Sequence, residues 1–230
     1  MQRFSRFLAL SLGLSIMAGC ATINEQVKAI LPTQQESSEI ETAEPEIRLV
    51  AEDKFKQSRM ALSAQQQRMV GPIYQAVSKT ATNSGQLDAS IQALETYIAS
   101  NAGSDIPSML FLALGDGYTQ LGQEANAMSA WQQSIRTNQL NYFAHNRLAQ
   151  ALRQQGDFDQ ARQHYNTALE AWPDFADAYR NRGILFDLYL GDKVLALKDY
   201  QQYHQLLERN GENTREVERW LREVQRAISE

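Results

Sequence analysis

The sequence predicts an all-helical protein in which pairs of helices repeat along the chain. The 230 residues include only 12 Gly and 5 Pro, while Ala, Leu and Gln are plentiful, and this composition favours helices over turn-rich sheets. The segments 111–134 and 145–168 align with each other at one constant offset. The segment 212–230 places apolar side chains at helical spacing.

The segment 1–19 has the three parts of a secretory signal. Arg3 and Arg6 make the start positive, an apolar run of 12 residues extends from Phe7 to Ala18, and small residues follow. The run is shorter than the roughly 20 residues that span a bilayer comfortably. We therefore expect residues 1–19 to be a signal peptide that is removed.

The only cysteine of the chain, Cys20, stands directly behind this run. Met17-Ala18-Gly19-Cys20 resembles the bacterial lipobox, although Met17 replaces the usual Leu. The resemblance implies that Cys20 carries acyl chains, which anchor stably because each buried CH₂ contributes about 0.8 kcal/mol. Ala21 in place of Asp implies delivery to the outer membrane, with the protein facing the periplasm. The alternatives are ordinary cleavage near Ala21, which leaves a free periplasmic protein, and an uncleaved anchor.

Residues 20–46 predict a flexible acidic linker behind the lipidated cysteine. Residues 32–46 read PTQQESSEIETAEPE and hold too few apolar side chains to fold. Such a chain spans roughly 25–30 Å on average. Loss of Arg3 and Arg6 with the signal changes the formal net charge from −5 to −7, so the charge argues against nucleic acid as a partner. Residues 47–70 indicate an N-terminal helix that is broken at Gly71-Pro72.

Three repeat units follow at residues 108–141, 142–175 and 176–211. Five positions recur in every unit. On the first helix these are a small residue, a larger residue that fills the space beside it, and a glycine that ends the helix. On the second helix they are an alanine where the two helices cross closely and an aromatic residue. These sets are Gly115, Ala149 and Gly183; Tyr118, Leu152 and Phe186; Gly122, Gly156 and Gly191; Ala127, Ala161 and Ala196; and Trp131, Tyr165 and Tyr200. The offset stays constant until one residue is inserted between Phe186 and Gly191. The pattern resembles the tetratricopeptide repeat, whose period is about 34 residues, and this resemblance implies a right-handed superhelix of about three to four helix-turn-helix units.

Residues 71–104 indicate a degenerate fourth unit before these three. Pro72 would start its first helix, Gly85 would end that helix, and Leu94 and Tyr97 would lie on the second. Residues 212–230 indicate a C-terminal capping helix, with Asn213 and Glu216 as a capping box. Its apolar stripe would cover the exposed end of the last repeat, although a helix that binds a partner or a second copy is the alternative. The stripe consists of Val217, Trp220, Leu221, Val224 and Ile228.

Catalytic and metal-binding patterns are missing from the sequence, so we expect no enzyme, no metal and no cofactor. His145, His164 and His204 lie on the repeat helices without the spacing of a metal motif. Asp157 and Asp159 fall in the turn between two helices, where acidic residues favour a helix start. The chain also lacks a glycine-rich phosphate loop and the Gly-x-Ser-x-Gly nucleophile elbow.

The resemblance to tetratricopeptide repeats implies that the first helix of each unit lines a concave groove for a protein or peptide partner. Arg147, Arg153 and Arg180 are candidate donors to a peptide backbone or carboxylate, together with Asn146 and Asn181. The groove is similar to the carboxylate clamp of chaperone-binding domains but lacks its Lys residues. The full set of candidate groove residues is Met109, Leu112, Asp116, Thr119, Phe143, Asn146, Arg147, Gln150, Arg153, Asp177, Arg180, Asn181 and Asp187.

These observations predict an outer-membrane lipoprotein whose periplasmic repeat domain holds a protein or peptide of the cell envelope. Families with this plan include pilotins of type IV pilus secretins and proteins that recruit peptidoglycan hydrolases, and the last repeat is similar to those found beside TonB-type transport or gliding machinery. One alternative is an accessory or hydrolytic protein that acts on peptidoglycan, which needs paired carboxylates in one cleft. The other is a structural protein that self-associates through its last helix. The sequence leaves the oligomeric state open.

Overall fold

A computed structural model describes residues 62–78 and 84–230, and within them every regular element is a helix. The signal segment 1–19, Cys20 with the linker 20–46, and residues 47–61 of the predicted N-terminal helix lie outside the described residues. The helices are α3 (Ala64–Ser78), α4 (Ser84–Ser100), α5 (Ser108–Gln120), α6 (Glu124–Thr137), α7 (Tyr142–Gln154), α8 (Phe158–Ala171), α9 (Ala176–Ile184), η1 (Leu185–Leu190), α10 (Lys193–Asn210) and α11 (Arg215–Ser229).

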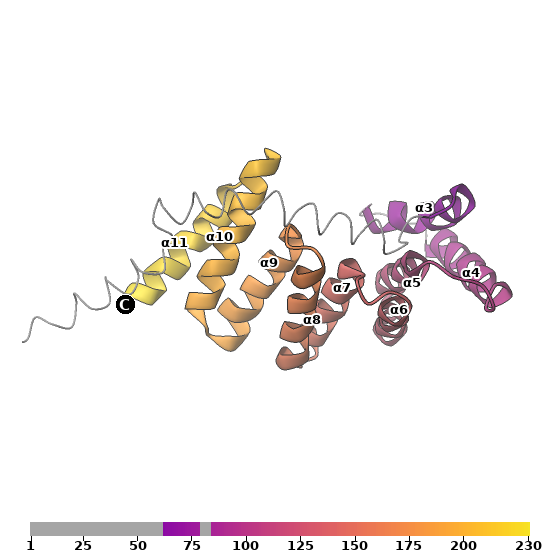
Figure 1. Ribbon diagram of the computed structural model, residues 1–230, viewed down its shortest axis with the longest axis horizontal. Coiled ribbons are helices and arrows are strands. Elements are labelled where there is room, and N and C mark those ends of the chain that lie inside the picture. The colour runs from indigo at the N-terminus through magenta and orange to yellow at the C-terminus, as the bar shows by residue number, and fades with distance from the viewer. Residues whose placement is uncertain (1–61, 79–83) are drawn as a thin grey trace, which may run out of the picture. The chain divides into compact units, whose positions relative to one another are not determined.

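Consecutive helices pack as pairs, and each pair packs on the next, as Figure 1 shows from α3 to α11. The pairs α5/α6, α7/α8 and α9/α10 are the three predicted helix-turn-helix repeats, so the predicted fold is confirmed. Buried apolar side chains form a chain of clusters between neighbouring pairs rather than one central core. This distribution is typical of repeat proteins, in which each unit contacts only its neighbours. None of the helices in the described part of the chain combines the length and the apolar content needed to cross a membrane.

Glycines close the first helix of each repeat, as the sequence predicts. Gly122, Gly156 and Gly191 have φ angles of 70°, 85° and 69°, the left-handed conformation that side chains disfavour. Behind the first glycine, the backbone N–H of Gln123 donates to the Tyr118 carbonyl at 2.9 Å. This bond satisfies a carbonyl at the end of the helix, where no further turn is available. The second helices of the later two repeats then start at Asp157 and Asp192, whose carboxylates accept N–H groups of the first turn.

The inserted residue of the third repeat is accommodated in η1, a π-helix of 6 residues. One extra residue in an α-helix would rotate everything after it by about 100°. The wider π turn absorbs this residue instead. The closing bond at the end of the first helix shows the difference, because it links Leu152 to Asp157 in the second repeat and Phe186 to Asp192 in the third. Helix α10 can therefore still pack on α9 as the second helices of the other repeats pack on their partners.

The N-terminal helix differs from the prediction. The sequence predicts a break at Gly71-Pro72, but α3 continues through Pro72 to Ser78. Its start is fixed further upstream by a capping box, in which Ser63 N–H donates to Gln66 Oε1 at 2.9 Å and Gln66 N–H donates to Ser63 Oγ at 3.3 Å. The predicted helix end at Gly85 is also wrong, since Gly85 lies inside α4. Helices α3 and α4 pack together and against α5, in the place of a first, degenerate pair.

The last helix covers α10 with the predicted apolar stripe. Val217 and Val224 are buried, and the rest of the stripe packs partly buried on the cluster around Tyr200 and Leu207. The predicted capping box does not form, because Asn213 Oδ1 accepts the N–H of Arg215 at 3.0 Å rather than that of Glu216. Thr214 instead precedes the first turn of α11.

Candidate functional site

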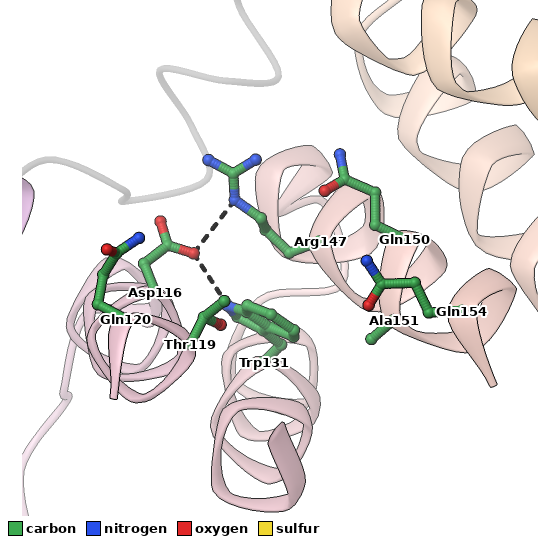
Figure 2. Close-up of a pocket in the computed structure, with 8 residues that line it drawn as sticks. All are labelled: Asp116, Thr119, Gln120, Trp131, Arg147, Gln150, Ala151 and Gln154. Atoms are coloured by element: carbon green, nitrogen blue, oxygen red, sulfur yellow. Dashed lines mark hydrogen bonds and ion pairs between the residues drawn. The ribbon is translucent and has the colours of Figure 1, made fainter. Parts of the chain in front are cut away.

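A pocket of about 250 Å³ lies between the first helices of the first two repeats, α5 and α7 (Figure 2). Trp131 of α6 contributes its indole ring from the second helix of the first repeat. The pocket therefore joins two consecutive repeats along the row of first helices. Its lining consists of Asp116, Thr119, Gln120, Trp131, Arg147, Gln150, Ala151 and Gln154.

Gly115 brings Trp131 into the pocket. A Cβ atom at position 115 would lie 2.3 Å from Trp131 Nε1, so only glycine lets α5 and the indole approach this closely. The indole N–H then donates to Asp116 Oδ1 at 3.2 Å. The repeat position that the sequence marks as small therefore places a hydrogen-bond donor against a carboxylate of the neighbouring residue.

Asp116 also fixes Arg147 across the pocket. Arg147 Nε donates to Asp116 Oδ1 at 3.1 Å, and the side chains are 39% and 7% exposed, respectively. Burial raises the pKa of Asp116 above its usual value, while the Arg147 charge and the two hydrogen bonds limit the rise. Figure 2 shows the two terminal nitrogens of Arg147 directed away from Asp116. The pair therefore holds the guanidinium in place and leaves its forked end available to an acceptor.

Helix α3 approaches the same pair through Tyr74. Burial raises the pKa of the Tyr74 hydroxyl, and the negative charge of Asp116 raises it further. The carboxamides of Gln120, Gln150 and Gln154 line the same pocket. Each carboxamide can both donate and accept hydrogen bonds, as a peptide backbone requires. The pocket thus brings together one oriented cation, its partner carboxylate, a hydroxyl and several neutral amides.

Four of the candidate groove residues meet in this pocket, namely Asp116, Thr119, Arg147 and Gln150. Three others, Leu112, Asn146 and Asn181, are buried and do not line the pocket. Leu112 belongs to the core around Trp131. Asn146 is 1% exposed and its Oδ1 accepts a hydrogen bond from Asn181 Nδ2 at 3.1 Å. These two asparagines join α7 to α9 and so stabilise the stacking of repeats.

The remaining candidates lie elsewhere and most have partners within the protein. Arg153 Nη1 donates to the Tyr189 hydroxyl at 3.0 Å, and the Arg180 guanidinium lies 5.9 Å from the centroid of the Trp220 ring. Asp187 accepts a hydrogen bond from Lys193 Nζ at 2.6 Å. Met109 and Phe143 pack on the aromatic cluster of α7 and α8, whereas Asp177 is exposed in the first turn of α9.

The groove positions taken from the resemblance do not include Gln120, Trp131, Ala151 or Gln154. Gln120 and Gln154 occupy equivalent positions in two repeats, and each directly follows a candidate position, Thr119 and Arg153. This repeated glutamine was a signal in the sequence that could have identified them. The sequence pattern predicts Trp131 only as a packing residue. Its indole N–H reaches Asp116 in the pocket because the two helices approach closely at Gly115, which the sequence pattern does not show.

Metal-binding side chains do not gather within residues 62–78 and 84–230, where no group of three or more His, Cys, Asp and Glu could hold an ion. His145 and His164 form a pair, with 2.8 Å between their Nδ1 atoms. His145 Nε2 faces the carbonyl oxygen of Gln139 at 3.2 Å and must donate to it. His145 Nδ1 is then the acceptor for the His164 Nδ1–H, so the pair is a hydrogen bond between two neutral rings.

Comparison with protein families places tetratricopeptide repeats in the middle of the chain. A family model described as a TPR repeat matches residues 149–187, and one described as a tetratricopeptide repeat matches residues 130–163. These matches cover the second repeat and parts of both neighbours, in agreement with the helix pairs of the structure. No curated protein matches the chain.

Several solved structures have a similar arrangement of helices, among them the following three. The first TPR of Spaghetti (RPAP3) bound to the HSP90 peptide SRMEEVD is 21% identical, with 54% of this chain and 94% of that chain covered and a TM-score of 0.49. The TPR2B domain of yeast Sti1, in its pHsp70 complex, is 20% identical, with 52% of this chain and 97% of that chain covered and a TM-score of 0.48. A MamA structure is 17% identical, with 62% and 88% covered and a TM-score of 0.47.

Proposed function

We propose that this protein is a non-catalytic scaffold that binds a protein or peptide partner in the pocket between α5 and α7. The observation that carries the proposal is the Arg147 guanidinium, which Asp116 holds by its Nε while its terminal nitrogens point away. A guanidinium fixed in this way loses little side-chain entropy when an acceptor binds to its fork. The tetratricopeptide repeats at residues 130–187 support the proposal, because such repeats form extended binding surfaces.

The partner segment that suits this pocket carries a side-chain carboxylate or amide oxygen for Arg147. Asp116 compensates most of the Arg147 charge, so the site favours an acceptor without demanding a fully charged ligand. Gln120, Gln150 and Gln154 would then bind the backbone on either side of that acceptor. Hydrogen bonds to the backbone give affinity with little dependence on sequence, and the Arg147 contact gives direction.

Capture from detergent-solubilised cell envelope tests this function. The wild-type protein should retain a specific envelope partner, and Arg147→Ala should lose most of it. Arg162→Ala is the matched control, because Arg162 is half exposed on α8 and pairs only locally with Asp159 at 3.2 Å. Equal capture by wild type and Arg147→Ala, or no envelope partner for the wild type, would contradict the proposed site.

The scaffold, in this proposal, is attached to the outer membrane through lipid on Cys20 and faces the periplasm. The support comes from the sequence alone, namely the signal pattern, Met17-Ala18-Gly19-Cys20 and Ala21. Labelling of cells with palmitate should mark the wild-type protein and leave Cys20→Ala unlabelled. Fractionation should find the wild type with the outer membrane. An unlabelled wild type in the soluble fraction would contradict the lipid anchor but would not bear on the proposed binding pocket.

A further inference from the structure

The third repeat carries a group of exposed apolar side chains at its inter-helix turn. Leu188, Tyr189 and Leu190 of η1 and Val194 of α10, which we call the apolar knuckle, are four of the five large hydrophobic side chains exposed among the described residues. Leu188 is 69% exposed. Exposed apolar groups that cluster in this way are typical of interaction sites.

Two members of the knuckle, Leu188 and Tyr189, occupy repeat positions that are polar in the other repeats. Counted back from the glycine that ends the first helix, Leu188 and Tyr189 correspond to Thr119 and Gln120 in the first repeat. In the second repeat they correspond to Arg153 and Gln154. Thr119, Gln120 and Gln154 line the pocket between α5 and α7. The same row of side chains is therefore polar at the pocket and apolar at the third repeat.

Contacts with the second repeat hold the knuckle beside this row. The Arg153 guanidinium lies 5.0 Å from the centroid of the Tyr189 ring and donates to its hydroxyl at 3.0 Å. Phe158 also lies against this ring, with 5.3 Å between the two ring centroids. Tyr189 is thus ordered before any partner binds, which reduces the entropy lost on binding.

The π turn distinguishes this surface from an ordinary repeat turn. The residue inserted between Phe186 and Gly191 lengthens the turn while the buried side chains Leu185 and Phe186 keep their places in the core. The added length is therefore taken up by the exposed residues of η1. Single-turn π-helices within α-helices occur frequently at functional sites, since the insertion costs stability that selection would otherwise remove.

We propose that the apolar knuckle binds an apolar side chain of the same peptide that occupies the pocket at Arg147. The partner is then a peptide with an acceptor for Arg147 and, further along its length, a Leu, Met or aromatic residue. The first of these contacts rests on the proposed function, and the second is carried by the knuckle. A second copy of this chain is a poorer occupant, because four side chains do not provide the roughly 1,200–2,000 Å² that a stable interface buries.

Selection from a library of short random peptides tests the proposal with a defined probe. The target is the full mature chain with Cys20→Ser. Peptides selected by this protein should share an acidic or amide residue and, at a constant spacing, an apolar one. A synthetic peptide of this kind should bind Leu188→Ser about tenfold more weakly. Leu140→Ser is the matched control, because Leu140 is the fifth exposed large hydrophobic side chain and lies outside the knuckle.

The variants separate this inference from the proposed function. Peptides selected with Leu188→Ser as the target should still share the acceptor residue but not the apolar residue. Peptides selected with Arg147→Ala as the target should share the apolar residue but not the acceptor. Deletion of Leu188, which restores the regular repeat period, should act as Leu188→Ser does if it folds. Wild-type peptides that share an acceptor but no apolar residue overturn the knuckle alone. Peptides without a shared acceptor overturn the proposed function, and light scattering that shows dimers lost in Leu188→Ser assigns the knuckle to self-association instead.

Discussion

Single residues decide how closely the two helices of a repeat approach. A Cβ atom on Gly115 would meet Trp131, and one on Gly183 would lie 2.7 Å from Tyr200 Cε1. Both pairs repeat the same contact between a small residue on the first helix and an aromatic ring on the second. Since interiors are packed as tightly as organic crystals, neither ring has space to move aside without disturbing its neighbours.

Gly115→Ala should therefore destabilise the protein even though alanine favours a helix. Overpacking costs about 1–3 kcal/mol, and the gain in helix propensity is about 1 kcal/mol. We expect the free energy of unfolding to fall by about 1 kcal/mol in urea titrations. Gly103→Ala is the control, since no atom lies within 4 Å of its added Cβ. A more stable Gly115→Ala protein would show that Trp131 can relocate.

The His145–His164 pair predicts that acid destabilises the fold between about pH 6.5 and pH 4. Burial and the neighbouring His164 lower the pKa of His145 from 6.5 to about 4, and burial lowers the pKa of His164. In this window the unfolded chain binds more protons than the folded chain, so stability rises with pH and falls as pH decreases. At 1.36 kcal/mol per pKa unit, the fall between pH 7 and pH 5 should be about 1–2 kcal/mol.

Comparison with His145→Gln isolates this effect from the carboxyl groups. Burial raises the pKa values of Asp116 and Asp199, so these groups take up protons more readily in the folded state and oppose the histidines as pH falls. Urea titrations at pH 7 and pH 5 should therefore show a smaller loss of stability for His145→Gln than for the wild type. An identical loss in both proteins would assign the proton uptake to other groups.

At the scale of elements, helix ends and helix faces were not equally predictable. The apolar stripe of α11 was visible because burial repeats with the helical period. Ends depend on one or two hydrogen bonds, and competing caps lie close together in sequence. Ser63 and Gln66 start α3 well before Pro72, and Asn213 bonds the nearer N–H. Pro72 therefore lies inside the helix and does not mark one of its ends.

Helix α11 should act as a structural cover whose loss exposes α10. Trp220 packs on Tyr200 and Tyr203, with ring centroids 5.4 Å and 6.4 Å away, but it stays partly exposed. Trp220→Ala should lower the free energy of unfolding by about 2–3 kcal/mol, somewhat less than a fully buried aromatic residue would. Arg222→Ala, on the exposed face of the same helix, should change it by less than about 0.5 kcal/mol. An unchanged stability with lost partner capture would make α11 a docking helix.

At the scale of the whole molecule, the separate apolar clusters predict that stability is local. Leu94 of α4 is fully buried in the cluster of α3, α4 and α5, and Leu207 of α10 is buried in the cluster beneath α11. Leu94→Ala should reduce hydrogen-exchange protection mainly in α3 to α5, and Leu207→Ala mainly in α10 and α11. Equal loss of protection throughout the chain for either variant would indicate one cooperative unit.

The repeat period predicted the fold well, whereas the candidate site was predicted only in part. Residue types that recur at a constant period mark the positions where the helices pack together. The contact between Gly115 and Trp131 is one of these predicted contacts. Groove positions carried over from the resemblance identify a helix face but not the depth of each side chain on it. Asn146 lies on the expected helix, yet its short side chain is covered by α9 and bonded to Asn181. The π turn could not be predicted from the one inserted residue, because a loop longer by one residue would give the same spacing between Phe186 and Gly191.

The position of the extra residue has a consequence for engineering. A designed module of the regular period could be spliced at the junction of Asn141 and Tyr142, since the units on both sides share that period. Such a graft would lengthen the array and move Arg147 and Leu188 together away from α5, so it would separate Arg147 from Asp116 and divide the pocket. A module added behind residue 211 would have to match a longer unit and replace α11 as well. A module inserted in the middle therefore divides the binding site, whereas a module added at the end must replace the helix that covers α10.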